Sequence, residues 1–310
     1  MHNSKPSKGS RWYIAYRKIR FIAKKGSLFS QSKPLKGSRS SEVPQGIFKI
    51  ISLNSILLFL IAYLFIYILN LFITGFTAVL FDIPVAVYYY DVDYLIRGID
   101  WTPDSVAGVF SSGPIAMFVL TLFLLLLYKS VETETGLLRL LLLWMIFHAI
   151  TRFFGEILVG AIFNKGFGFV ILYMFVMDTG KVILTILGFV AMFTTGLFMT
   201  RSALYSANIY FNDLLRIYRY KFILFQFIIP FFIGNLVIFL VKIPHINYFD
   251  LALNASMMLC LIPILVRSIS MEDLYFDEDP RSIKLKMVFP IATLLLLISF
   301  RIILGVGIRL

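Results

Sequence analysis

Long apolar runs constrain this chain more than any other feature. Seven segments are long and apolar enough to form helices that cross the hydrocarbon core of a bilayer, which takes about 20 residues. They lie at 50–81, 109–128, 137–162, 167–200, 222–241, 249–266 and 287–305. With 59% hydrophobic and 15% charged residues, the chain lacks the polar surface that a water-soluble protein needs. The sequence therefore predicts an all-α, polytopic integral membrane helix bundle, and it excludes a soluble enzyme or a specific nucleic-acid-binding domain.

Local features refine this prediction. Thr102 followed by Pro103 is typical of a helix start, and it predicts where the second span begins. The segment 167–200 fits either one long helix or a broken one. Its three glycines at eight-residue spacing predict close helix packing rather than a ligand site; they are Gly180, Gly188 and Gly196.

The distribution of basic residues predicts the orientation. Cytoplasmic connections of membrane proteins carry an excess of Lys and Arg. If residues 1–49 lie inside, alternating spans place 22 of the 29 basic residues on that side, and only five lie on or near the other. We therefore expect the N-terminus inside and the C-terminus outside. The absence of a cleavable signal favours a bacterial inner membrane.

We expect residues 1–49 to form a basic, largely disordered cytosolic tail, and residues 50–310 to form the membrane domain. The tail holds 12 of the 29 Lys and Arg residues but only one of the 17 acidic residues, Glu42. Residues 11–25 fit an interfacial helix that binds anionic lipid headgroups. Alternatives are a solvated tail that only fixes orientation, and a transit peptide.

Two connections are rich in acidic residues. The predicted outside segment 82–108 carries five Asp, four Tyr and Trp101, with Arg97 as its one base. We favour an interfacial aromatic belt there, and the alternative is a vestibule for a cationic or sugar-like ligand. The predicted inside loop 267–286 carries a second acidic group, comprising Glu272, Asp273, Asp277, Glu278 and Asp279. A solvated loop is the simpler interpretation, and docking to the basic tail is the alternative.

The third and fourth spans carry an unusual cluster of ionisable residues. His148, Arg152 and Glu156 follow one another at four-residue spacing on one helix face. Asp178 and Lys181 lie in the next span. Charges in a bilayer are costly and usually pair inside the protein, so we expect Arg152–Asp178 and Glu156–Lys181 contacts.

The third span also places His148 at the position of the second His in an HExxH zinc motif. Trp144 replaces the first His, and Met145 replaces the catalytic Glu. Zinc hydrolysis needs both groups, so we expect no metal site. The sequence also contains no phosphate-binding loop or dinucleotide fingerprint, and we expect no cofactor.

Three function classes remain. A transporter or permease would use the charged cluster to line a polar path, with proton coupling through His148 or Glu156. A non-catalytic subunit or scaffold would use the buried ion pairs to fix helix register, and its tail and loops to bind protein partners. A membrane-embedded enzyme acting on a lipid-like substrate is less favoured, because the inside loops show no paired catalytic motif.

Overall fold

A computed structural model of the chain describes residues 45–131, 137–172, 174, 180–211, 213–271, 274–276 and 288–310. The chain divides into two units, Met1–Val43 and Pro44–Leu310, and every described residue belongs to the second. The predicted tail, with its interfacial helix 11–25, therefore lies outside the described residues apart from 45–49, which begin the first helix. Asp178 and the five acidic residues of the loop 267–286 also lie outside them.

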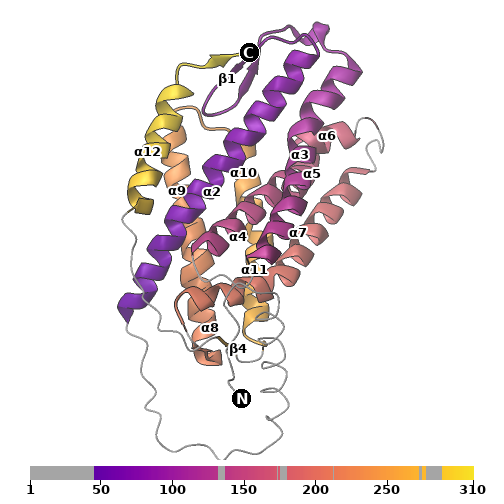
Figure 1. Cartoon of the computed structure of the whole chain (residues 1–310). Coiled ribbons are helices and arrows are strands. Elements are labelled where there is room, and N and C mark those ends of the chain that lie inside the picture. The colour runs from indigo at the N-terminus through magenta and orange to yellow at the C-terminus, as the bar shows by residue number, and fades with distance from the viewer. Residues whose placement is uncertain are drawn as a thin grey trace, which may run out of the picture. The chain divides into compact units, whose positions relative to one another are not determined.

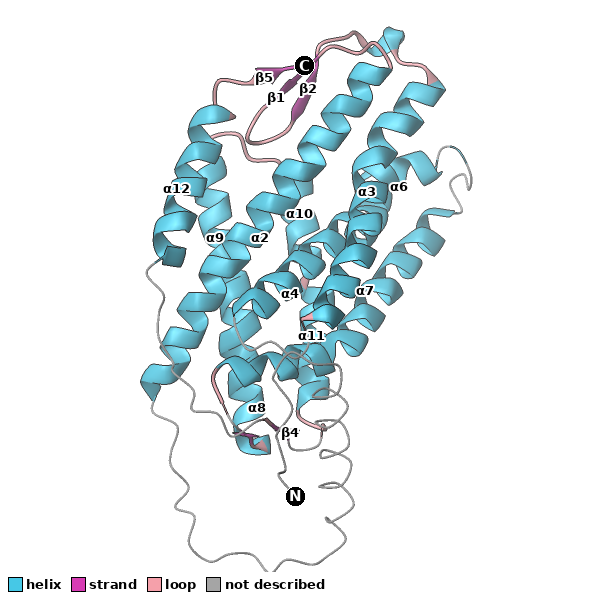
Figure 2. Ribbon diagram, viewed as in Figure 1, coloured by secondary structure: helices cyan, strands magenta, loops and turns pink. Residues whose placement is uncertain are grey.

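The described chain is a helix bundle with short strands at its two ends (Figures 1 and 2). Its α-helices are α2 (Gln45–Leu80), α3 (Pro103–Ser130), α4 (Leu137–Ile150), α5 (Glu156–Phe163), α6 (Gly166–Ile171), α7 (Gly180–Tyr205), α8 (Arg216–Ile223), α9 (Ile229–Lys242), α10 (Tyr248–Ser256), α11 (Met258–Ser268) and α12 (Val288–Ile303). Its strands are β1 (Val85–Val87), β2 (Val92–Tyr94), β3 (Asp213–Leu214), β4 (Leu274–Tyr275) and β5 (Ile308–Arg309).

Six helical segments of the described chain are long and apolar enough to cross a membrane. They are Gly46–Leu80, Pro103–Ser130, Leu137–Phe163, Gly180–Ile209, Arg216–Lys242 and Tyr248–Ser268. The shorter apolar helix α12 has 16 residues. The prediction of an all-α membrane helix bundle is confirmed. The predicted start of the second span is also confirmed, since Thr102 caps α3 by accepting a hydrogen bond from the Ser105 amide.

Strand pairing shows which connections share an end of the bundle. β1 pairs antiparallel with β2 and with β5, so the α2–α3 connection lies beside the C-terminus. β3 pairs with β4, which joins the α7–α8 and α11–α12 connections at the other end. We call the first the C-terminal end and the second the opposite end (Figure 1). Which compartment each end faces stays a prediction.

Two membrane-spanning segments contain a π-helical turn. In the third, η3 (Thr151–Gly155) separates α4 from α5, and in the fifth, η6 (Leu224–Ile228) separates α8 from α9. A π turn shifts the helical register by about one residue and often occurs at functional sites. The sequence pattern predicts neither turn, and η3 contains Arg152.

The predicted fourth segment, 167–200, contains two described helices, α6 and α7. α6 lies against α5, because Gly168 meets the backbone of Gly160 where no side chain would fit. Gly166, with φ of 57°, lets the chain turn into α6. Residues 173 and 175–179, between the two helices, lie outside the described part of the chain, so the choice between one long helix and a broken one stays open.

The predicted packing role of the glycines is confirmed for two of the three. A Cβ at Gly188 would lie 2.9 Å from the Cβ of Leu158 in α5. A Cβ at Gly196 would meet the carbonyl oxygen of Cys260 in α11. α7 therefore approaches both neighbours at backbone contact distance.

Candidate functional site

Three charged side chains from three spans meet inside the bundle. The Arg152 guanidinium donates to Oδ1 of Asp250 at 2.7 Å, and the Lys242 ammonium donates to Oδ2 of the same carboxylate at 2.6 Å. We call Arg152, Lys242 and Asp250 the triad. All three side chains are buried. Each carboxylate oxygen of Asp250 thus has its own cation, which is the pairing that buried charges require.

Local structure explains why these residues meet. Lys242 is the last residue of α9, and Asp250 lies in the first turn of α10, so a short connection brings them together. The N-terminus of a helix favours a carboxylate in its first turn. Asn247 caps α10 by accepting a hydrogen bond from the Phe249 amide at 3.0 Å.

An aromatic side chain of α2 supports both cations. The Lys242 Nζ lies 3.8 Å from the centroid of the Tyr67 ring, and the Arg152 Cζ lies 5.0 Å from the same centroid. The Tyr67 hydroxyl donates to the carbonyl of Tyr90 at 2.7 Å. Cation–π contacts are strongest where water is excluded, so Tyr67 contributes to holding the two positive groups in place.

Glu156 is a fourth buried charge, one turn beyond Arg152. It accepts a hydrogen bond from the backbone of Phe167. The structure gives it no ion pair with another described residue, including Lys181. With Glu156 ionised, the triad and this carboxylate together carry no net charge. Glu156 differs from Asp250 in having no cation bound to it.

The charged groups line a cavity of about 660 Å³ at the C-terminal end of the bundle. Arg152, Glu156 and Asp250 contribute to its wall, as do Asp91 and Lys165. The rings of Tyr94, Trp101 and Phe110 also line it and pack together, with centroids 5.1 to 5.7 Å apart. The volume lies within the usual range of small-molecule sites, and the wall combines apolar rings with a few charged groups.

Asp91 ties the segment between α2 and α3 to α10. Its Oδ1 accepts a hydrogen bond from the Val92 amide at 2.9 Å, and its Oδ2 accepts one from the Asn247 side chain at 3.1 Å. Asp91 is exposed toward the cavity, but the surrounding protein still displaces part of the water around its carboxyl, and this partial desolvation raises the pKa of Asp91.

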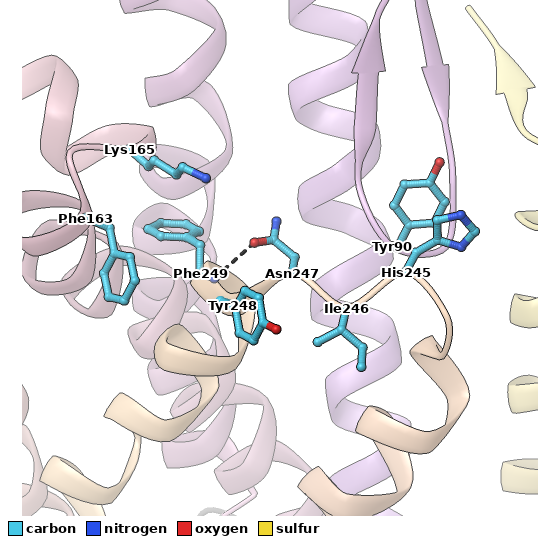
Figure 3. A pocket seen from close by; sticks show the side chains of 8 residues that line it. All are labelled: Tyr90, Phe163, Lys165, His245, Ile246, Asn247, Tyr248 and Phe249. Carbon is cyan, nitrogen blue, oxygen red and sulfur yellow. Dashed lines mark hydrogen bonds between the residues drawn. The ribbon is translucent and has the colours of Figure 1, made fainter.

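A second hollow of about 580 Å³ adjoins the cavity (Figure 3). The two share Tyr90, Lys165, Asn247 and Phe249 in their walls. Figure 3 shows the His245 ring beside Tyr90, and their centroids lie 4.4 Å apart in a stacked arrangement. Tyr89 and the His245 Nδ1 lie 2.8 Å apart in a hydrogen bond. The connection between α9 and α10 therefore forms one wall of this second hollow.

The structure brings together part of the predicted cluster and adds residues to it. Arg152 and Glu156 lie at the cavity, and His148 is buried deeper along the same span. Arg152 pairs with Asp250, a partner that sequence analysis did not name, and the expected partner Asp178 lies outside the described residues. The expected Glu156–Lys181 ion pair is not among the ion pairs of the described residues, and Lys181 is only half-buried.

The predicted outside segment 82–108 contributes to the site more than an aromatic belt would. Tyr90, Asp91, Tyr94 and Trp101 line the cavity, as the vestibule interpretation requires. Asp93, Asp100 and Asp104 are exposed and do not line it. Among the residues that the structure describes, no three His, Cys, Asp or Glu side chains gather as metal ligands.

Comparison with known protein families, with characterised proteins and with solved structures finds no match to this chain. The cavity and its charged wall are therefore the features that indicate a function.

Proposed function

We propose that this multi-pass membrane protein is a permease for a small zwitterionic solute, which enters the cavity at the C-terminal end. The observation that carries the proposal is the position of the charged groups. A cluster that only fixed helix register would be dry and fully paired, whereas here it borders a cavity open at one end of the bundle.

The charges of the wall indicate the class of solute. Glu156 and Asp91 offer carboxylates without an ion pair to a described residue, and Lys165 offers an ammonium in the same cavity. A solute with a positive and a negative group complements such a wall. When it binds, each of its charges loses contacts with water and gains a contact with an opposite charge of the wall. The aromatic side formed by Tyr94, Trp101 and Phe110 suits an apolar portion or a cationic group.

Ligand-induced stabilisation of the purified full-length protein tests the proposal. Zwitterionic amino acids should raise the melting temperature, and the matched amines, carboxylates and amides should do so less. Counterflow of the best solute in proteoliposomes then tests transport directly. Equal, negligible effects of all four classes would contradict a zwitterion site and favour the scaffold alternative.

Variants localise the effect. Glu156→Gln keeps the shape of the side chain but removes its charge, so the affinity for the solute should fall by roughly tenfold to hundredfold. Asp104→Asn is the matched control, because Asp104 is exposed and does not line the cavity. An unchanged affinity in the Glu156 variant would remove this residue from the site.

A further inference from the structure

Buried polar side chains continue beyond the triad toward the opposite end of the bundle. On α2, Tyr67 and Tyr63 stack with centroids 5.3 Å apart, and Ser55 and Asn54 lie between two and four turns before them. At 1.5 Å per residue, Tyr63 and Asn54 are separated by about 14 Å along the helix. All of these side chains are almost fully buried, so α2 carries polar groups on more than one of its faces inside an apolar bundle.

His148 of α4 fills the interval between Tyr63 and Ser55. Its ring lies 5.5 Å from that of Tyr63 and 4.6 Å from that of Phe59. A hydrogen bond with the backbone of Phe59 engages the ring, while Nε2 has no partner among the described groups. A ring nitrogen that donates to a carbonyl leaves the other nitrogen as a proton acceptor. The ionisable groups near His148 are Tyr63 and, one turn along its own span, Arg152.

The π turn η6 completes this series of polar groups. Trp144 donates to the Ser55 hydroxyl at 2.9 Å, and Ser55 donates to the carbonyl of Gln226 at 2.5 Å. A π turn disturbs the regular helical hydrogen bonds, which leaves the Gln226 carbonyl available to Ser55. The side chain of Gln226 is fully buried beside this contact.

Three buried polar atoms along this path have no hydrogen-bond partner in the described chain, namely Nε2 of His148 and both side-chain amide atoms of Gln226. The Tyr63 hydroxyl lies within hydrogen-bond reach of Lys242. The hydroxyl of Tyr210, which follows the end of the fourth span, lies within hydrogen-bond reach of the Asn54 side chain. Buried polar groups almost always have partners, and water is the partner that fits where protein supplies none.

We infer that Tyr63, His148, Ser55, Gln226, Asn54 and Tyr210, here called the polar file, form a hydrated proton path from the triad to the opposite end. His148 accepts a proton from water at Nε2, which forms the imidazolium, and the same Nε2 then gives a proton to water toward the other end, which restores the neutral ring. The rings of Phe59 and Tyr63 pack against His148, so the polar file carries protons and not the solute. This inference extends the proposed permease by giving it a proton path, which conducts whether or not solute occupies the cavity.

Cysteine accessibility tests whether the polar file is hydrated. Cys260 is the chain's one cysteine and is buried, so Cys260→Ala provides a background without thiols. In that background, Ser55→Cys should react with aqueous Ag⁺ roughly tenfold or more faster than Ala149→Cys. Ala149 is equally buried but packs in an apolar cluster with Ile66 and Met117. Equal rates would show that the polar file is dry and would overturn the inference.

Proton flux tests its function without any solute. Liposomes containing the full-length protein and an internal pH dye are given a potassium diffusion potential. The wild type should pass protons faster than protein-free liposomes, and His148→Phe, which keeps an aromatic ring, should reduce that flux by about tenfold or more. Thr293→Val is the control, because Thr293 is a buried polar residue of α12 outside the polar file.

A wild-type flux no greater than that of protein-free liposomes, or an unchanged flux in His148→Phe, would overturn the proton path. Solute-induced stabilisation is measured separately and should persist in the His148 variant. Loss of the proton path with retained solute-induced stabilisation would contradict the polar file and leave the permease proposal intact. Proton flux without solute-induced stabilisation would contradict the permease proposal instead.

Discussion

Asp250 is the residue on which the triad depends, because one carboxylate neutralises two buried cations. Asp250→Asn would leave Arg152 and Lys242 facing each other without a counter-charge. We expect the free energy of unfolding to fall by about 3–5 kcal/mol, the usual cost of removing one partner of a buried ion pair. Thermal melting in detergent measures this loss. Asp93→Asn, at an exposed carboxylate, is the control, and equal melting of the two variants would contradict the importance of the triad.

Asp91 gives the molecule a predictable dependence on pH. Its raised pKa means that the folded state holds this proton more tightly than the unfolded state. The contribution of Asp91 to stability is therefore greatest at low pH, and it declines as pH rises from about 4, the ordinary value, through the raised pKa. Asp91→Asn removes this decline, so the variant should gain stability relative to the wild type toward neutral pH. Melting curves from pH 4 to 8 give this difference, and a constant difference would contradict the raised pKa.

At the scale of helices, the sharpest constraint is the contact between α7 and α11. Gly196→Ala places a methyl group against the Cys260 carbonyl, which belongs to the backbone and cannot rotate away. Overpacking of this kind typically costs about 1–3 kcal/mol, which should appear as a lower melting temperature. Gly46→Ala is the matched control: it lies in α2 with open space around it, so its effect should be neutral or slightly stabilising. A Gly196 variant as stable as the wild type would show that the two helices separate easily.

The helices and part of the site could be predicted from sequence, for identifiable reasons. Long apolar runs have few alternatives to spanning helices, and Arg152 and Glu156 stand out because charges inside such runs are rare. Lys242 and Asp250 gave no such signal, since each lies at the end of a span, where charged residues are common. Only the short α9–α10 connection, folded back into the bundle, brings them to Arg152. The π turns were equally hidden, because apolar periodicity does not distinguish a π turn from an α turn.

At the scale of the whole molecule, the helix order and the strand pairs place the cavity and the C-terminus at the same end. The positive-inside prediction assigns that end to the outside, so the cavity should receive solute from outside the cell. This assignment depends on the basic residues, because 22 of the 29 fall on the predicted inner side. Basic residues favour that side because they bind anionic lipid there and resist translocation during insertion.

Thiol labelling of intact bacteria that express the protein tests this orientation. In the Cys260→Ala background, Arg97→Cys places a thiol at the C-terminal end, at a side chain that is 87% exposed. Ser4→Cys places one in the basic tail. A membrane-impermeant maleimide should label the Arg97 variant in intact cells, and the Ser4 variant only after permeabilisation. The reverse pattern would turn the cavity toward the cytoplasm. The same solute site would then serve export, because the charges that recognise a zwitterion do not depend on the side from which it arrives.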